Sequence, residues 1–143
     1  MNNPIIQVKE EFAGKIMNFE EHSTRRIYIE IAPQDIADVA RFLFTELAFR
    51  FATASAIDTP KGIEILYHFS HDNSGKMLTI RTLIKDKKDP HIESITPIIK
   101  AAEWIEREMW EMLGIQFDHH PNLKKLLLAE DWPEGEFPLR HED

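Results

Sequence analysis

The feature that most constrains the fold of this chain is a series of strand-like segments in its first two thirds. Along residues 26–32, isoleucines alternate with Tyr28 and Glu30, and this period of two is typical of a strand with one buried face. The turn sequences DTPKG and HDNSG separate the later segments, so they predict a three-stranded meander. Its strands are expected at residues 49–57, 63–69 and 77–85.

Helical patterns flank these strands. Pro33 is expected to open a helix with an apolar stripe formed by Ile36, Val39, Ala40, Leu43 and Leu47. A weaker pattern at residues 8–16 predicts a short helix near the start of the chain. The order of these elements indicates an α+β two-layer sandwich, with a mixed sheet of about five strands, helices on one face and an extended C-terminal tail.

A long helix is predicted after the meander, with Thr96 as its cap, Pro97 at its first position and Gly114 at its end. Its expected buried stripe consists of Ile98, Ala102, Ile105, Met109 and Met112.

The acidic residues of this helix are unusual for its last turns. Glu106, Glu108 and Glu111 would lie where the helix dipole favours basic side chains. Ion pairs among Glu103, Arg107 and Glu111 would account for Arg107 but not for Glu106 and Glu108. The pattern favours a partner-docking role for this end of the helix, and an ordinary solvated face is the alternative.

The segment EREMWEMLGIQFDHHPNLKKLLL, residues 106–128, resembles the signature of the 30-kDa subunit family of respiratory NADH dehydrogenase, or complex I. Members of this family also occur in energy-converting membrane-bound hydrogenases, whose compact versions this short chain resembles. The later run DWPEGEFPLR is similar to the family's following segment. The chain departs from the family pattern at five positions, namely Glu111 for Asp, Leu113 for an aromatic residue, His119 for Gly, Lys125 for Arg and Phe137 for His.

The resemblance implies a non-catalytic peripheral subunit of an oxidoreductase that uses NADH or a related donor and reduces quinone or protons. The implied partners are the hydrogenase-like large subunit of the 49-kDa type and neighbouring iron–sulfur subunits. The expected docking residues are Glu106, Arg107, Glu108, Glu111, Gly114, Phe117, His120, Pro121, Leu123, Lys125, Trp132, Pro138, Leu139 and Arg140.

The chain is expected to form one α+β domain at residues 1–116, followed by a proline-rich docking tail at residues 117–143. The net charge is −8, and residues 101–143 carry 11 acidic and 4 basic side chains. Such a surface disfavours nucleic acid and anionic lipid and suits a basic protein partner. No apolar run is long enough to span a membrane and the N-terminus does not resemble a signal peptide, so we expect a cytoplasmic protein peripheral to the membrane.

The chain has no cysteine, so thiolate nucleophiles and the usual iron–sulfur ligands are excluded. Its five glycines are too dispersed for a P-loop or a dinucleotide-binding fingerprint. We therefore expect no cofactor and no catalytic residue on this chain, with the iron–sulfur clusters carried by partner subunits.

Two alternatives from other classes remain at this point. A small metal-dependent enzyme would use Asp118, His119 and His120, or the group His68, His71 and Asp72, as ligands. A free-standing ligand-binding α+β module would contain a closed apolar pocket.

Overall fold

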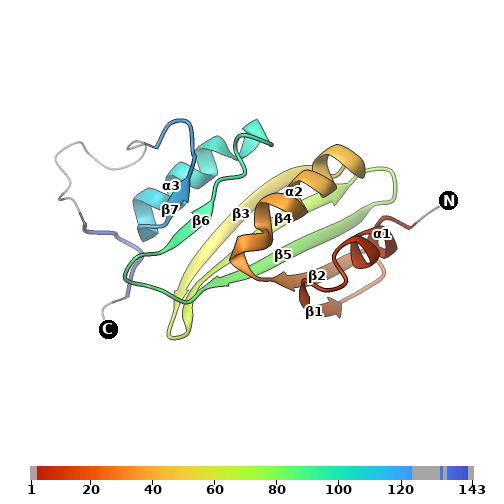
Figure 1. Ribbon diagram of the computed structural model, residues 1–143, viewed down its shortest axis with the longest axis horizontal. Helices are drawn as coiled ribbons and strands as arrows, with labels where there is room; N and C mark the ends of the chain where they lie inside the picture. Colours follow the sequence, from red (N-terminus) through yellow and green to blue (C-terminus); the bar gives the residue numbers. More distant parts are fainter. Residues whose placement is uncertain (1–2, 124–132, 134, 142–143) are drawn as a thin grey trace.

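The computed structural model describes residues 3–123, 133 and 135–141 and is built around a five-stranded sheet (Figure 1). The strand order is β1-β2-β5-β4-β3, and the neighbours are antiparallel except for β2 and β5, which are parallel. The prediction of an α+β fold with a mixed five-stranded sheet is therefore confirmed. The strands are β1 (Ile16–Glu21), β2 (Arg26–Ile31), β3 (Arg50–Thr59), β4 (Gly62–His71) and β5 (Lys76–Ile84).

The buried face of the sheet follows the period-two pattern of the sequence. Ile29 of β2 pairs with Ile80 of β5, and Ile80 pairs with Tyr67 of β4, so the three side chains form one buried row across the sheet. The meander of β3, β4 and β5 lies where the turn sequences place it. Each large apolar side chain buried in this way stabilises the fold by about 1.5–3 kcal/mol.

Figure 1 shows helices α1 (Pro4–Glu11) and α2 (Ile36–Arg41) over the same face of the sheet. Ile36, Val39, Ala40 and Leu43 are buried as predicted, whereas Leu47 is half-buried. A 3-10 turn, Pro33–Asp35, precedes α2 and a π-helical turn, Phe42–Glu46, follows it.

The helix predicted at residues 8–16 is displaced toward the N-terminus. Asn3 caps α1 by accepting a hydrogen bond from the Ile5 N–H at 2.9 Å, and Pro4 occupies the first helical position. The helix therefore ends at Glu11, and β1 starts at Ile16.

The long helix predicted from Pro97 begins six residues later, as α3 (Glu103–Leu113). Ile98 and Ile99 instead donate backbone hydrogen bonds to the carbonyl of Ile95, and a 3-10 turn, Lys100–Ala102, leads into the helix. The Thr96 hydroxyl does not cap a helix because it is buried and donates to a side chain of α3. Within the predicted stripe, Ala102 and Met109 are buried and Ile98, Ile105 and Met112 are half-buried.

The predicted end of α3 at Gly114 is confirmed. Gly114 adopts a left-handed conformation with φ of 77°, and its N–H donates to the Trp110 carbonyl at 2.8 Å. The short strands β6 (His91–Glu93) and β7 (Gln116–Asp118) then form a parallel pair that the sequence did not predict. In Figure 1 they lie with α3 beside β3, and α3 packs against this strand.

No helix within the described parts of the chain is both long and apolar enough to cross a membrane.

Candidate docking surface around helix α3

The first acid of the signature segment, Glu106, is completely buried inside the domain. One carboxylate oxygen accepts hydrogen bonds from the Ser94 hydroxyl at 2.5 Å and the Thr96 hydroxyl at 2.6 Å, and the other accepts from the Ile95 N–H at 2.9 Å. These four residues are called the Glu106 brace below. The brace fixes the turn at residues 94–96 to the first helical turn of α3.

The position of Glu106 corrects the expectation based on the helix dipole. Because α3 begins at Glu103, Glu106 lies in its first turn, where the dipole favours a negative charge. Burial raises the pKa of Glu106, although the three hydrogen bonds oppose this effect. Burial also raises the pKa of Tyr67 well above its ordinary value, with a contribution from the Glu106 charge. Glu106 is therefore an internal structural group and not an exposed interface charge.

His120 fixes the loop after β7 to the same turn of α3. Its Nε2 lies 3.1 Å from the carbonyl oxygen of Glu103, and its Nδ1 lies 2.9 Å from the Asn122 N–H. The carbonyl can only accept and the N–H can only donate, so these partners assign the tautomer with the proton on Nε2. The ring is buried and lies 3.9 Å from the Glu106 carboxylate.

A segment near the C-terminus covers the other end of α3. The Phe137 ring lies so close to Gly114 that a Cβ atom there would come within 2.6 Å of it. The Leu139 N–H donates to the Met112 carbonyl at 2.9 Å, and the Arg140 guanidinium donates to the Leu113 carbonyl at 2.9 Å. Arg140 thus places a cation where the helix dipole is negative.

Asp58, at the end of β3, anchors this segment and was not found from the sequence. Its buried carboxylate lies 2.7 Å from Lys87 Nζ and 3.4 Å from Arg140 Nε, and it accepts the His141 N–H at 2.7 Å. Burial alone would raise the pKa of Asp58, but the hydrogen bonds and charges of these partners outweigh it and lower the pKa. The only local signal was an acid in the register of the buried Ala54 and the half-buried Ala56.

The expected docking residues divide into inward-facing and outward-facing groups. Glu106, Arg107, Glu111 and Phe117 are buried, and the Arg107 guanidinium carbon lies 4.9 Å from the centre of the Trp104 ring. Pro121, Pro138 and Leu139 are exposed, and Glu108 and Leu123 are half-buried. Lys125 and Trp132 lie outside the described residues.

The sequence analysis did not select Trp104, which is 59% exposed on the outer face of α3. A large exposed apolar side chain was the signal that could have identified it, but exposure is not visible in a sequence. We use the name α3 rim for the solvent-facing side chains on α3 and on the segments bonded to it. The rim consists of Trp104, Glu108, Pro121, Leu123 and Leu139.

The structure does not bring the proposed metal ligands together. Asp118 bonds to His91, His119 bonds to Glu93, and His120 turns into the domain toward α3. In the other group, His68 bonds to Thr79, His71 to Ser74 and Asp72 to Arg50. Among the described residues, no three His, Asp or Glu side chains converge as a metal site would require.

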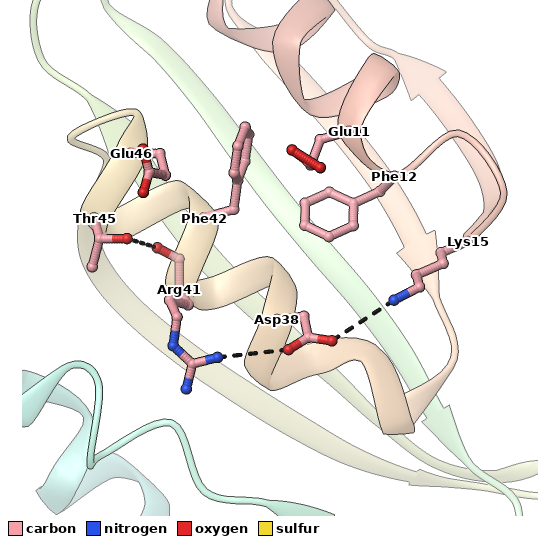
Figure 2. Close-up of a pocket in the computed structure, with 8 residues that line it drawn as sticks. All are labelled: Glu11, Phe12, Lys15, Asp38, Arg41, Phe42, Thr45 and Glu46. Atoms are coloured by element: carbon pink, nitrogen blue, oxygen red, sulfur yellow. Dashed lines mark hydrogen bonds and ion pairs between the residues drawn. The ribbon is translucent and has the colours of Figure 1, made fainter.

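A groove of about 390 Å³ lies between α1 and the end of α2 (Figure 2). Phe12 and Phe42 meet edge to face in it with ring centres 5.5 Å apart. Asp38 forms ion pairs across its rim with Lys15 at 3.7 Å and Arg41 at 3.6 Å. This charged surface groove differs from the closed apolar pocket that the ligand-binding alternative predicts.

The fold and this site define a small α+β domain whose signature segment folds inward to support a rim of exposed side chains. Residues 29–143 match the family model of the 30-kDa subunit of respiratory-chain NADH dehydrogenase, and the chain belongs to this family. The resemblance read from residues 106–128 is therefore confirmed.

Individual relatives agree with this assignment. The chain is 28% identical over 137 residues to the C-type subunit of the NADH-quinone oxidoreductase of Geobacter sulfurreducens, a match that covers 92% of this chain and 83% of the relative. It is 32% identical over 118 residues to the C-type subunit of the same enzyme in Ruegeria pomeroyi, covering 78% of this chain and 57% of the relative.

Two solved structures share the fold. A chain of the membrane-bound sulfane sulfur reductase, an archaeal respiratory membrane complex, matches with a TM-score of 0.83 at 23% identity, covering 96% of this chain and 81% of that one. A trypsin-resistant fragment of Nqo5 matches with a TM-score of 0.72 at 18% identity, covering 85% of this chain and all of the fragment.

Proposed function

We propose that this chain is a non-catalytic peripheral subunit of a membrane-attached oxidoreductase complex, of the NADH:quinone oxidoreductase or energy-converting hydrogenase type. It docks through the α3 rim onto the hydrogenase-like large subunit and lies beside neighbouring iron–sulfur subunits on the cytoplasmic side. The observation that supports this most directly is the exposed Trp104 on the helix that carries the family signature.

The Glu106 brace and His120 give the signature a physical role in docking. They hold the turn at residues 94–96 and the loop at residues 117–123 against α3 before any partner binds. A preformed surface loses less conformational entropy on association than a flexible one. The buried signature residues therefore act on docking through the shape of the rim.

The outward-facing side chains of the rim provide the contacts. Trp104 and Leu139 are both more than half exposed, and exposed aromatic residues often dominate the energy of an interface. Glu108 and the acidic excess of residues 101–143 complement a basic partner surface.

The role of the subunit is to hold cofactor-bearing neighbours at fixed spacing and to exclude water from their contacts. The absence of cysteine leaves the chain without the usual ligands of an iron–sulfur cluster. The electron-transfer groups therefore belong to the partners, and the NADH, ferredoxin or quinone chemistry belongs to the whole complex.

Affinity purification of the tagged chain from its native host, followed by mass spectrometry, tests this function. The wild-type chain should recover a hydrogenase-like large subunit, and Trp104→Ala should reduce that recovery at least tenfold, because an interface anchor contributes about 2 kcal/mol or more. Phe44→Ala is the matched control, since Phe44 is 41% exposed on the turn after α2. Recovery of the wild-type chain alone would refute the docking role.

A further inference from the structure

His91, the first residue of β6, has a carboxylate at each nitrogen of its ring. Its Nδ1 lies 2.8 Å from Asp118 Oδ1, and its Nε2 lies 2.8 Å from Asp89 Oδ1. An ionised carboxylate only accepts hydrogen bonds, so both nitrogens must donate. Only the protonated imidazolium has two N–H groups, and the geometry therefore describes a charged His91.

The two carboxylates belong to segments that His91 joins. Asp89 lies in the loop before β6, and Asp118 is the last residue of β7, where the chain enters the loop that carries His120 and Pro121. The β6–β7 pair is short, and few backbone bonds hold it, among them Gln116 N–H to the Pro90 carbonyl and Ser94 N–H to the Asp118 carbonyl. A side-chain bridge across so short a ladder adds substantially to its attachment.

The chain directly after Asp118 has a conformation that needs support. His119 has a φ of 66°, a left-handed conformation that is unfavourable for residues other than glycine. Its Nδ1 lies 2.8 Å from Glu93 Oε1, so a second histidine–carboxylate pair joins the same two strands. The start of the loop is thus held by two bridges whose strength depends on protonation.

We propose that His91 is a proton-operated clamp that holds the end of β7 and the loop at residues 119–123 in their docking shape, so that docking through the α3 rim weakens as the pH rises. This inference rests on the proposed docking function and adds its regulation.

The charges around His91 fix the direction of the effect. Asp118 faces the ring from β7 and Asp89 from the preceding loop, and the neighbouring pair is Glu93 with His119, while Lys87 is directed to Asp58. The hydrogen bond to Asp118, assisted by the bond to Asp89 and both negative charges, raises the pKa of His91. The clamp is therefore complete below the ordinary histidine pKa and is released as the pH rises through the raised value.

An NMR titration of the full chain tests the clamp without any partner. The His91 ring should titrate above the ordinary histidine value of about 6.5, and the backbone amides of Asp118, His119 and Asn122 should shift with the same midpoint. His91→Gln should abolish this shared transition. His22→Gln is the matched control because His22 contacts the single carboxylate of Glu20 beside β1. An ordinary His91 midpoint, or amides that do not follow it, would overturn the clamp.

A second experiment links the clamp to docking by measuring binding to the purified large subunit between pH 6 and pH 9. The wild-type affinity should fall at least threefold across this range. His91→Gln should bind weakly and His91→Arg tightly, both with a smaller dependence on pH, because glutamine stays neutral and arginine stays charged. Equal pH dependence in all three would overturn the regulation and leave docking intact. A lack of binding at every pH would overturn the docking function itself, and the NMR titration would still report on the clamp.

Discussion

Two regions of this molecule bury very different side chains. The sheet layer, β1–β5 with α1 and α2, is filled mainly by aliphatic and aromatic residues. The α3 lobe, residues 91–123 and 135–141, buries Glu106, Arg107 and Glu111 beside its apolar residues. Apolar burial is non-directional and gives the domain its stability, whereas buried polar groups need partners in fixed places. The lobe therefore gives up some stability in exchange for a defined surface.

The comparison predicts that the two regions fail in different ways. A cavity in the sheet layer should weaken the whole domain, because all five strands share one core. A lost hydrogen-bond partner in the α3 lobe should loosen the lobe first, because the affected groups lie in turns and a single helix.

The largest effect is expected for Phe69→Ala in β4. Phe69 is fully buried, and its ring centre lies 5.6 Å from that of Phe51. Its removal should lower the free energy of unfolding by about 3–5 kcal/mol, as measured by urea denaturation followed by circular dichroism. Ile57→Ala is the control, since Ile57 is 56% exposed on β3 and should change stability by less than about 0.5 kcal/mol. A loss below about 1 kcal/mol for Phe69→Ala would show that the sheet layer does not rest on this core.

A smaller and more local effect is expected for Glu106→Ala. The variant leaves the Ser94 and Thr96 hydroxyls and the Ile95 N–H without their acceptor, at a cost of about 3 kcal/mol. Hydrogen exchange should show faster opening of residues 94–123, while the amides of β4 and β5 stay protected.

Two further variants separate the brace from a general effect of charge. Glu106→Gln should cost less than Glu106→Ala, because its amide can donate to the two hydroxyls and its oxygen can accept from the Ile95 N–H. Glu108→Ala removes a half-buried acid of the same helix and should change stability by less than about 0.5 kcal/mol. If Glu106→Ala opened β4 as readily as residues 94–123, the two regions would form a single cooperative unit.

The same difference explains what the sequence could predict. Period-two patterns are visible in neighbouring residues, so the strands and the buried row of Ile29, Ile80 and Tyr67 followed from the sequence. The start of α3 was wrong because Thr96 and Pro97 form a local helix signal, whereas the Thr96 hydroxyl is used by Glu106 ten residues later.

Other parts of the α3 lobe depend on contacts that no local pattern encodes. Arg140 and His141 reach Asp58 across more than 80 residues of chain, and β6 and β7 are too short to show a period. The signature showed that residues 106–128 matter, but only the structure separates the buried Glu106 from the exposed Trp104.

The smallest expected effect comes from comparing Gly114→Ala with Gly135→Ala. Both glycines have a left-handed conformation, with φ of 77° and 81°, so alanine should cost each about 1–2 kcal/mol in backbone strain. Only Gly114 faces the Phe137 ring, because no atom lies within 4 Å of a Cβ placed on Gly135. Gly114→Ala should therefore lose about 1 kcal/mol more and expose residues 135–141 to limited proteolysis. Equal losses and equal cleavage would mean that Phe137 is not held on α3, so that the lobe is braced at its Glu106 end alone.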